Sequence, residues 1–406
     1  MEKILRLPNG VRAVYEHAKS NVSYIGLFVQ AGSRDELQKK CAGIMHVIEH
    51  LIFKKTASRN YFELMNYIES VGGDMNAYTS KEETCIYISI QNQFLERAFD
   101  VLSDIFYHSE FVFEEFIKER EVIIDEINSY KDSPSELIFD EFEELMFAGH
   151  ELSSNILGTK KSLQAMTLAD ISMEYKRNYV NNKLMVSYVG AVEFEKVEAL
   201  LHTYFMEKTA QHDVRRTAFE CAKPQFSKIK NLRTHQMHCM LGTLAPSMYH
   251  EKKTAMVLLN NLMGGVSFNS LLNIALREEQ GLTYNVESSY VSYADTGIFA
   301  IYFGTDSSKL EQCKTTIFTI FKTLIDGTFT KAQLAMYKQQ LIGQVAMSFD
   351  NFSSLMISNA KSYMCYDKVD SYDEIVEKIQ AVSLATIQEL SHELFLKKGI
   401  SELIYR

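Results

Sequence analysis

The segment AGIMHVIEHLIFK, residues 42–54, decides the fold and the chemistry that this sequence predicts. Most of its positions are apolar, which predicts a helix buried inside a domain. His46 and His50 are about one helical turn apart and therefore share a face of that helix, and Glu49 lies on nearly the same face. Buried imidazoles and a buried carboxylate need a partner, and a cation satisfies all three.

The order His-x-x-Glu-His predicts a catalytic zinc site. A catalytic zinc ion takes three protein ligands and keeps one position open for water. We expect His46 and His50 to be two of the ligands. Glu49 is expected to be the general base, because a carboxylate beside the ion can take a proton from a zinc-bound water that attacks a peptide carbonyl. This motif is His-Glu-x-x-His in reverse and is typical of inverted zincins.

The third ligand is expected on a second helix, within the segment EREVIIDEI at 119–127. Glu119 and Glu126 are about two helical turns apart along one face of that helix. One of them can bind the metal while the other orients a ligand from behind. The spacing alone does not choose between the two.

The same order of predicted elements occurs twice along the chain. The first half is predicted to contain one strand, two helices, two strands, two helices, a strand and a helix, at 23–32, 41–55, 60–71, 74–80, 84–91, 93–108, 112–131, 184–192 and up to about 207. The second half repeats this order up to its last strand, at 235–245, 250–263, 269–280, 284–294, 297–305, 307–325, 330–349 and 401–406. Period-2 and helical apolar patterns distinguish the strands from the helices.

This repetition predicts an α+β fold made of two homologous, α/β-sandwich-like domains that arose from a duplicated unit. The polar stretch at 208–225 is the best candidate boundary. We therefore expect an N-terminal, zinc-bearing domain at 1–210 and a C-terminal domain at 220–406. Each is of the size that single domains commonly reach.

Composition restricts the class of protein. With 406 residues, of which 46% are hydrophobic and 23% charged, the chain is expected to be globular with at least two domains. A net charge of −10 argues against nucleic-acid binding, which needs a basic face. The first residues lack a secretory signal, and no uncharged apolar run approaches the roughly 18 residues that cross a bilayer. We expect a cytoplasmic protein that does not bind membranes.

Segments spread over almost the whole chain resemble the pitrilysin/insulinase family of inverted zincins, in particular its mitochondrial processing peptidase and short bacterial branch. They are LPNGVRAVYE (7–16), AGSRDE (31–36), AGIMHVIEHLIFK (42–54), VGGDMNAYTSKEET (71–84), EREVIIDEI (119–127), NILGTKKSL (155–163) and LREEQGLTY (276–284). In that family two four-domain halves enclose a chamber like a clamshell, and a chain of this length supplies one half. The resemblance therefore implies a homodimer, or a heterodimer with a related subunit.

The resemblance also implies roles for individual residues near the metal. The family's third ligand is a glutamate at the spacing from the second histidine that Glu126 has, and Glu119 then takes the supporting position behind a ligand. The family binds its substrate as an added strand along a sheet edge beside the zinc. The four residues that match this edge are Asn76, Ala77, Tyr78 and Thr79.

In its second half the family has an Arg and a Tyr that hold the substrate carbonyl near the scissile bond. Arg277 and Tyr284 match this pair. A cationic guanidinium and a phenol suit an oxygen that becomes negative in the tetrahedral intermediate. In a dimer they are expected to serve the zinc of the partner chain. Two departures from the family pattern are GGVSFNSL at 264–271, which lacks an Arg, and Lys55, where glycine is common.

The function that the resemblance implies is a zinc-dependent endopeptidase, with one zinc ion per chain, that hydrolyses peptides or leader segments. The alternative is a non-catalytic or partner-dependent subunit of a heterodimeric processing peptidase that acts as a peptide-binding scaffold. Because the motif residues and Glu126 are all present, the enzyme is favoured. A second metal site at His235, His238 and Cys239 is not expected, since the two histidines point to opposite faces of a strand.

Overall fold

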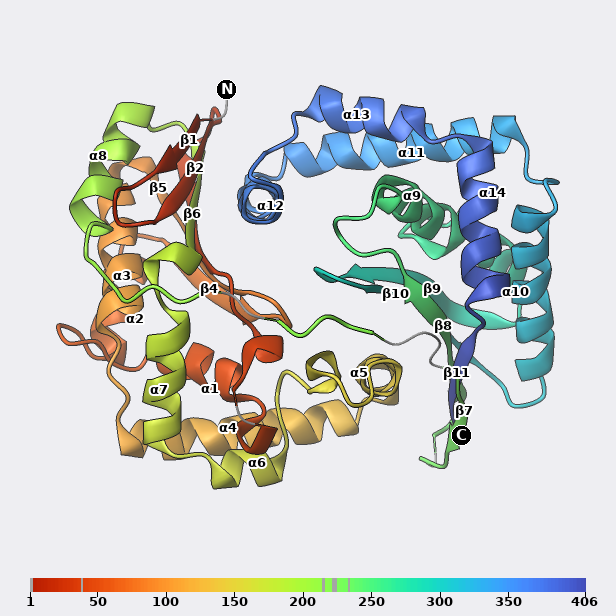
Figure 1. Cartoon of the computed structure of the whole chain (residues 1–406), viewed down its shortest axis with the longest axis horizontal. Helices are drawn as coiled ribbons and strands as arrows, with labels where there is room; N and C mark the ends of the chain where they lie inside the picture. Colours follow the sequence, from red (N-terminus) through yellow and green to blue (C-terminus); the bar gives the residue numbers. More distant parts are fainter. Residues whose placement is uncertain (1–2, 38, 214–215, 221–224, 233) are drawn as a thin grey trace. The chain divides into compact units, whose positions relative to one another are not determined.

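In a computed structural model the chain has a two-domain α+β fold, divided into two compact units (Figure 1). The structure describes residues 3–37, 39–213, 216–220, 225–232 and 234–406. Unit 1 consists of Met1–Asn128, Ser154–Arg216 and Met347–Asp370. Unit 2 consists of Ser129–Ser153, Thr217–Ala346 and Ser371–Arg406.

Unit 1 is built on a six-stranded sheet with the order β1-β2-β6-β3-β5-β4. Its strands are β1 (Lys3–Arg6), β2 (Arg12–His17), β3 (Val22–Val29), β4 (Asp74–Thr79), β5 (Thr84–Gln91) and β6 (Leu184–Gly190). Its helices are α1 (Ile44–Leu51), α2 (Tyr61–Glu69), α3 (Leu95–His108), most of α4 (Phe113–Lys131), α6 (Lys160–Ala165), α7 (Leu168–Asn178), α8 (Phe194–Tyr204) and α12 (Phe352–Tyr366). The main core lies between one face of the sheet and the helices of the first half of the chain.

Unit 2 is built on a five-stranded sheet with the order β7-β11-β8-β10-β9. Its strands are β7 (Ser227–Lys230), β8 (Met237–Ala245), β9 (Thr283–Ser292), β10 (Gly297–Thr305) and β11 (Ser401–Tyr405). Its helical elements are α5 (Pro134–Met146), α9 (Lys253–Gly264), the π-helical turn η6 (Asn273–Glu278), α10 (Leu310–Ile325), α11 (Lys331–Phe349), α13 (Tyr372–Ala381), α14 (Leu384–His392) and the π-helical turn η7 (Glu393–Lys397). Every residue of β10 is buried, as expected for a strand that is covered on both faces.

The two sheets have the same topology, which supports the predicted duplication. In unit 1 the order β2-β6-β3-β5-β4 has one parallel pair, β2 with β6, and the other pairs are antiparallel. In unit 2 the order β7-β11-β8-β10-β9 has its one parallel pair, β7 with β11, at the same place. Strand for strand, β4 corresponds to β9 as the last strand at one edge.

Each sheet has its second face covered by a helix from the other half of the sequence. Helix α5 packs on β8 and β11 in unit 2 and buries Phe142 there. Helix α12 packs on β6, β3 and β2 in unit 1 and buries Met356 there. The fit is close, because a Cβ added to Gly26 of β3 would lie 2.5 Å from the Met356 sulfur. Each half of the chain thus contributes one helix, α5 or α12, to the sheet of the other half.

The compact units therefore differ from the simple division into 1–210 and 220–406. The chain passes from unit 1 to unit 2 at Arg216, close to the predicted boundary, but the segments that contain α5 and α12 belong to the opposite units. The physical reason is that both faces of each sheet are apolar and need a cover. We retain 1–210 and 220–406 as the proposed duplicated halves.

The predicted strands and helices are all found, with ends shifted by a few residues. The predicted helix at 269–280 is π-helical over η6. The sequence reasoning did not predict ten of the elements named above, which are β1, β2, β7, α5, α6, α7, α12, α13, α14 and η7. Among the described residues, no helix combines the length and the apolarity that crossing a membrane requires.

Candidate metal centre

Helix α1 carries His46, Glu49 and His50 into unit 1, as the motif predicts. His46 is only 7% exposed, and Glu49 and His50 are half-buried. The apolar residues of the helix are buried in the core: Ile44, Met45, Val47, Ile48 and Leu51. Apolar packing on one side thus holds the three polar side chains on the other.

The start of α1 is fixed by a carboxylate. Gly43 precedes the helix with a φ of 92°, and a Cβ there would lie 2.7 Å from the carbonyl oxygen of Leu157. Both conditions favour glycine. The Glu36 carboxylate accepts hydrogen bonds from the backbone N–H of Gly43 at 3.1 Å and of Met45 at 3.2 Å. It satisfies free N–H groups at the positive end of the helix and so positions the residues that follow.

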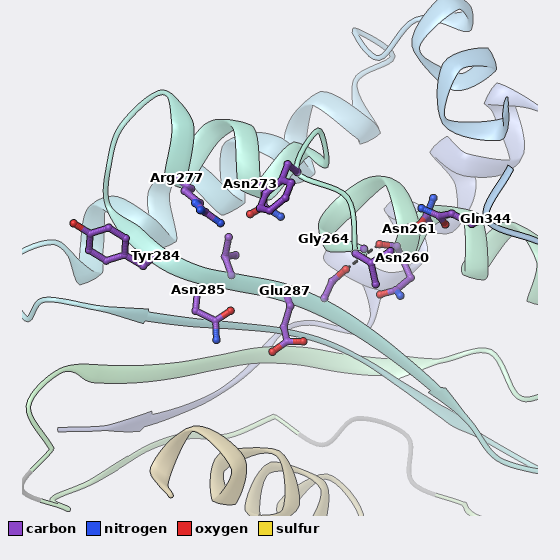
Figure 2. Close-up of a pocket in the computed structure, with 14 residues that line it drawn as sticks. Asn260, Asn261, Gly264, Asn273, Arg277, Tyr284, Asn285, Glu287 and Gln344 are labelled. Carbon is purple, nitrogen blue, oxygen red and sulfur yellow. Dashed lines mark hydrogen bonds between the residues drawn. The ribbon is translucent and has the colours of Figure 1, made fainter. Parts of the chain in front are cut away.

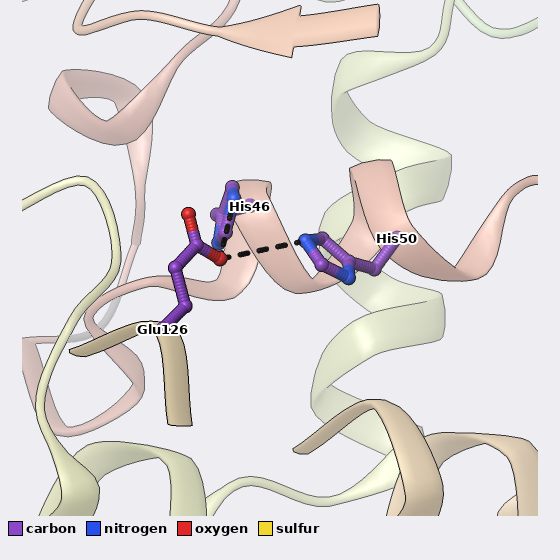
Figure 3. A group of neighbouring side chains, drawn as sticks. All are labelled: His46, His50 and Glu126. Carbon is purple, nitrogen blue, oxygen red and sulfur yellow. Dashed lines mark ion pairs between the residues drawn. The ribbon is translucent and has the colours of Figure 1, made fainter. Parts of the chain in front are cut away.

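Glu126, on helix α4, faces both histidines (Figure 3). The Nε2 atoms of His46 and of His50 each lie 3.9 Å from Oε2 of Glu126. One ligand atom from each of the three residues lies within 4.8 Å of the others, and the part of the chain that the structure describes contains no other such group of His, Cys, Asp or Glu. The structure thus places Glu126, rather than Glu119, opposite both Nε2 atoms.

The spacing and the donor set fit a zinc ion. Zinc binds His nitrogen and carboxylate oxygen at about 2.0–2.2 Å, so two ligands of one tetrahedral ion lie roughly 3.5 Å apart. The distances of 3.9 Å are close to this spacing and too long for hydrogen bonds. Two histidines and one carboxylate also form a ligand set typical of catalytic zinc.

The protonation of the three residues also favours a cation. Burial, followed by the neighbouring His50, lowers the pKa of His46 to about 3, so its imidazole is neutral at pH 7 and has a free lone pair. Burial raises the pKa of Glu126, and His50 lowers it only in part. A positive charge between the three side chains compensates for the half-buried carboxylate of Glu126, which the neutral imidazole of His46 does not.

Glu119 supports His50 from behind. Its Oε2 lies 3.0 Å from Nδ1 of His50, which leaves Nε2 directed towards Glu126. Its Oε1 pairs with the ammonium of Lys54 at 2.8 Å. Burial alone raises the pKa of Glu119, but the hydrogen bonds with Lys54 and His50 outweigh burial and lower it. Glu119 is therefore a carboxylate that fixes the tautomer and the orientation of His50.

Glu49 lines a cavity of about 250 Å³ together with His50. The remaining lining is mostly apolar and aromatic: Phe53, Lys54, Tyr61, Met65, Met75, Asn76, Ala77 and Glu119. Oε2 of Glu49 is buried and has no hydrogen-bond partner among the described residues. Burial raises the pKa of Glu49. A carboxyl group in such a place is well suited to take and return a proton.

The predicted substrate edge is strand β4, which is hydrogen-bonded to β5 and forms one edge of the sheet. Asn76 and Ala77 line the cavity beside Glu49. Tyr78 instead packs in the cluster under α12, and its hydroxyl donates to Glu83 at 3.0 Å. The buried hydroxyl of Thr79 lies beside the carboxyl group of Glu49 and offsets part of the rise in its pKa. Of the four predicted residues, two therefore line the cavity.

Arg277 and Tyr284 belong to unit 2, whereas the metal ligands belong to unit 1. Arg277 lies in the π-helical turn η6, with its guanidinium carbon 5.1 Å from the ring centroid of Phe268. Tyr284, near the start of β9, is 93% exposed. Both line one cavity of about 380 Å³ (Figure 2). Turns of π-helix are frequent at functional sites.

The second cluster of possible ligands does not form a metal site. His238 is buried, and its Nδ1 lies 2.8 Å from the hydroxyl of Tyr302. Cys239 is its neighbour on β8, and His235 is exposed before the strand. His238 is thus a core histidine with a hydrogen-bond partner.

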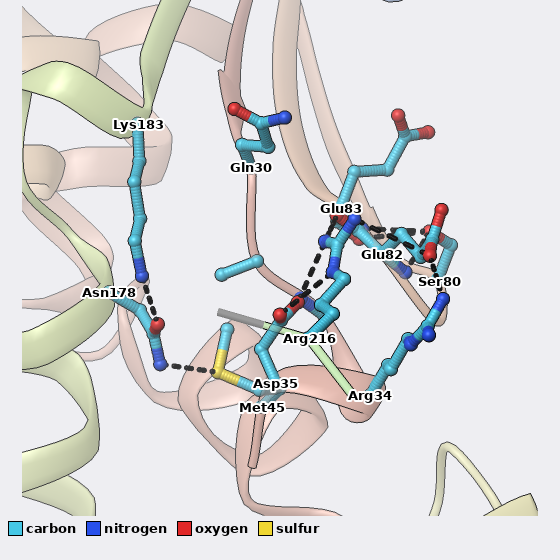
Figure 4. A network of polar contacts seen from close by, with 12 residues as sticks. Gln30, Arg34, Asp35, Met45, Ser80, Glu82, Glu83, Asn178, Lys183 and Arg216 are labelled. Atoms are coloured by element: carbon cyan, nitrogen blue, oxygen red, sulfur yellow. Dashed lines mark hydrogen bonds and ion pairs between the residues drawn. The ribbon is translucent and has the colours of Figure 1, made fainter. Parts of the chain in front are cut away.

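A network of buried charges holds the segment before α1 (Figure 4). The guanidinium of Arg216 makes two hydrogen bonds, both 2.9 Å long, to the Asp35 carboxylate, and it also donates to the backbone oxygen of Glu82 at 2.9 Å. Arg34 pairs with Glu82 at 2.6 Å. Asp35 precedes Glu36, which caps α1. The network therefore connects Arg216, in the polar stretch at 208–225, to the segment that precedes helix α1.

We expect Arg216→Ala to destabilise the protein by about 3–5 kcal/mol, because it leaves a buried carboxylate without its cation. The side chains of Asp35 and Arg216 are only 5% and 12% exposed. Denaturant unfolding followed by circular dichroism measures the change. Lys118→Ala, which removes an exposed pair with Glu115, is the control and should leave the stability almost unchanged. Equal effects of the two changes would contradict the prediction.

Comparisons with known proteins agree with this geometry. Residues 12–160 match the family model described as Insulinase (Peptidase family M16), and residues 165–341 match the model described as Peptidase M16 inactive domain. A Bacillus subtilis protein named as the uncharacterized zinc protease YmxG is 32% identical over 98% of this chain and 96% of its own length.

Two further similarities extend over the whole chain. The beta subunit of the mitochondrial-processing peptidase of Caenorhabditis elegans is 25% identical over 99% of this chain and 89% of its own length. The crystal structure of a protease from Helicobacter pylori has the same fold, with a TM-score of 0.93, 21% identity, and coverage of 100% of this chain and 99% of that one. The chain therefore belongs to the insulinase family of peptidases, family M16.

Proposed function

We propose that this protein is a zinc-dependent endopeptidase, in which His46, His50 and Glu126 bind one zinc ion per chain. The proposal is carried by the convergence of these three side chains, since the Nε2 atoms of His46 and His50 each lie 3.9 Å from Oε2 of Glu126. Glu49 and His50 line an open cavity at this place. Bound zinc supplies a Lewis acid that lowers the pKa of a water molecule. The names of the relatives as zinc proteases support this metal.

The protein's own residues perform the other steps. Glu49 accepts a proton from the attacking water and returns it to the leaving amine. The β4 edge at Asn76–Thr79 binds the substrate as an added strand, since its outer side has no neighbouring strand in the sheet. Arg277 and Tyr284 stabilise the carbonyl oxygen as it becomes negative.

The proposed assembly is a homodimer that encloses a chamber, in which Arg277 and Tyr284 of each chain serve the zinc of the other. The name of the Caenorhabditis elegans relative, a beta subunit, supports the second candidate, a subunit that needs a different partner. The complete set of His46, Glu49, His50 and Glu126 favours a catalytic chain over a scaffold. A cytoplasmic location stays a prediction.

The test is cleavage of a quenched fluorescent peptide library by purified protein of measured metal content, with and without a chelator. We expect about one zinc per chain and cleavage that the chelator abolishes and added zinc restores. Bound zinc without cleavage would favour the partner-dependent subunit. Cleavage that persists after the metal is removed would overturn the proposal.

The role of Glu119 leads to a separate prediction. Glu119→Gln should weaken zinc binding about 10- to 100-fold, because it removes the charge that orients His50. Competition with a chromophoric chelator measures the affinity. Glu121→Gln, on the exposed side of the same helix, is the matched control and should leave the affinity unchanged. Unchanged affinity in Glu119→Gln would show that the contact with His50 is only structural.

A further inference from the structure

The cavity of about 380 Å³ in unit 2 is lined by an unusual number of carboxamides (Figure 2). They are Asn260, Asn261, Asn273, Asn285 and Gln344. Figure 2 shows Asn260, Asn261 and Gln344 together at one end of the cavity, with Arg277 and Tyr284 at the other. The cavity thus adjoins the two residues that we expect to contact the substrate.

Of these five amides, two are hydrogen-bonded within the fold and two others each carry one atom without a partner. Nε2 of Gln344 donates to Ser267 at 3.0 Å, and Nδ2 of Asn273 donates to Ser270 at 2.9 Å. In contrast, Oδ1 of Asn260 and Nδ2 of Asn261 are buried and have no hydrogen-bond partner among the described residues.

Leaving such groups without a partner costs free energy. Asn261 is only 7% exposed. A buried donor and a buried acceptor without partners are rare in folded proteins and are expected to be used by a ligand or another bound group. Asn260 and Asn261, which both line the cavity, therefore carry one acceptor and one donor without a partner in the described structure.

The backbone leaves this space open. Gly264 and Gly265 end α9, and a Cβ on Gly264 would lie 2.6 Å from the backbone nitrogen of Ser288 on β9. A Cβ on Gly265 would lie 2.6 Å from Oδ1 of Asn261. Side chains at these two positions would displace the strand or the amide. The glycines thus allow α9 to approach β9 while the cavity stays open.

The cavity is the counterpart of the metal centre in the duplicated unit. In both units a helix after the first central strand packs on the edge strand, α1 on β4 and α9 on β9. Helices α4 and α11 both have 19 residues, and Glu126 and Gln344 occupy the same place counted from the first residue. At this place unit 1 has imidazoles and a carboxylate, whereas unit 2 has mostly amides, with Glu287 and Arg277 also lining the cavity, so the histidine ligands that suit zinc are missing from this lining.

We propose that this amide cavity is a second ligand site, which takes the carboxamide of an Asn or Gln side chain of the peptide substrate. The proposal rests on the proposed peptidase function. A carboxamide donates from its NH₂ to Oδ1 of Asn260 and accepts at its oxygen from Nδ2 of Asn261. A carboxylate cannot donate to Asn260, an ammonium cannot accept from Asn261, and a thioether leaves both amides unpaired.

The test uses fluorogenic octapeptides in which Gln, Glu or Met occupies one position at a time. We expect one position at which Gln is cleaved with a kcat/KM about tenfold or more above both Met and Glu, because a site built to hydrogen-bond its ligand rejects analogues that lack the matching groups. Asn261→Leu, close in shape, should reduce the Gln-to-Met ratio to about one. Asn269→Leu, at an exposed position in the loop after α9 and outside the cavity, should keep the ratio.

A second variant guards against a folding defect in the first. Asn260→Asp makes the free acceptor negative and should shift the preference from Gln to Lys. Binding of the same peptides to the full-length Glu49→Gln chain, followed by fluorescence polarisation, should show the same preference and tests the cavity when no peptide is cleaved. Cleavage without any Gln preference, or a preference that survives Asn261→Leu, would overturn the amide site. Absence of cleavage with a retained Gln preference in binding would overturn only the peptidase.

Discussion

Glu49→Gln is expected to keep its zinc and to cleave peptides about 10²- to 10⁴-fold more slowly than the unchanged chain. The substitution preserves the shape of a side chain that lines the cavity beside His50 but removes its ability to accept a proton. Zinc content measured by atomic absorption and kcat measured with a fluorogenic peptide separate the two effects. The ligands His46, His50 and Glu126 are untouched by the change.

Glu69→Gln is the control for this substitution, since Glu69 is exposed at the end of α2 and outside the cavity. It should cleave at the normal rate. Normal cleavage by Glu49→Gln would show that another group takes the proton. Loss of zinc from Glu49→Gln would instead show that Glu49 supports the metal ligands.

Arg277→Ala is expected to lower kcat about 10²- to 10³-fold, as for loss of one donor to a developing oxyanion. The side chain is 38% exposed and stacks near Phe268, so its removal leaves no buried charge and should leave the protein folded. Kinetics on a single fluorogenic peptide, with thermal unfolding as a check, measure the effect. Arg6→Ala, an exposed arginine of unit 1, is the control.

Mixing two inactive variants tests where Arg277 acts. If Arg277 serves the zinc of the partner chain, a dimer of one Glu49→Gln chain and one Arg277→Ala chain contains one complete site. Activity should then rise well above that of either variant alone after subunit exchange. No rise, in a sample that native mass spectrometry shows to contain the mixed dimer, would place Arg277 and the zinc of the same chain together.

The part of the candidate metal centre on α1 could be predicted from the sequence because His46, Glu49 and His50 are close together on one helix. The His-x-x-Glu-His spacing and the apolar residues around it determine which side chains of α1 share a face. The choice between Glu119 and Glu126 needed more, because both lie on the same face of α4. The family resemblance selects Glu126, and the three-dimensional path of α4 agrees with it: Glu126 faces both Nε2 atoms, while Glu119 contacts Nδ1 of His50.

Other contributors to the site have no local pattern. Glu36 caps α1 across a loop, and Lys54 pairs with Glu119 from the turn that follows α1. Arg216 reaches Asp35 from a polar stretch that the sequence marks only as a boundary. These contacts join residues that are distant in the chain, and composition or periodicity cannot detect them. The amide cavity was missed for the same reason, since Asn260 and Gln344 lie on separate helices.

The sequence analysis did not predict that α5 and α12 each cover the sheet of the other half of the chain. The pattern of α5 indicates an amphipathic helix, and Ser133 and Pro134 mark its start, but nothing local indicates which sheet it covers. The same holds for α12, whose buried residues contact strands more than 150 positions earlier in the chain. One example is the hydrogen bond that the Ser187 hydroxyl of β6 donates to the carbonyl oxygen of Met356 in α12. Local propensity predicts elements, whereas long-range packing decides their partners.

The exchange of α5 and α12 has a consequence for how this protein folds and evolves. The N-terminal half of the chain emerges from the ribosome first. One apolar face of its sheet stays uncovered until α12 has been synthesised, about 150 residues later. Such a face invites aggregation, so holdase chaperones are expected to engage this chain during translation. The exchange also makes the two halves interdependent. Each half, expressed alone, would lack the helix that covers one face of its sheet.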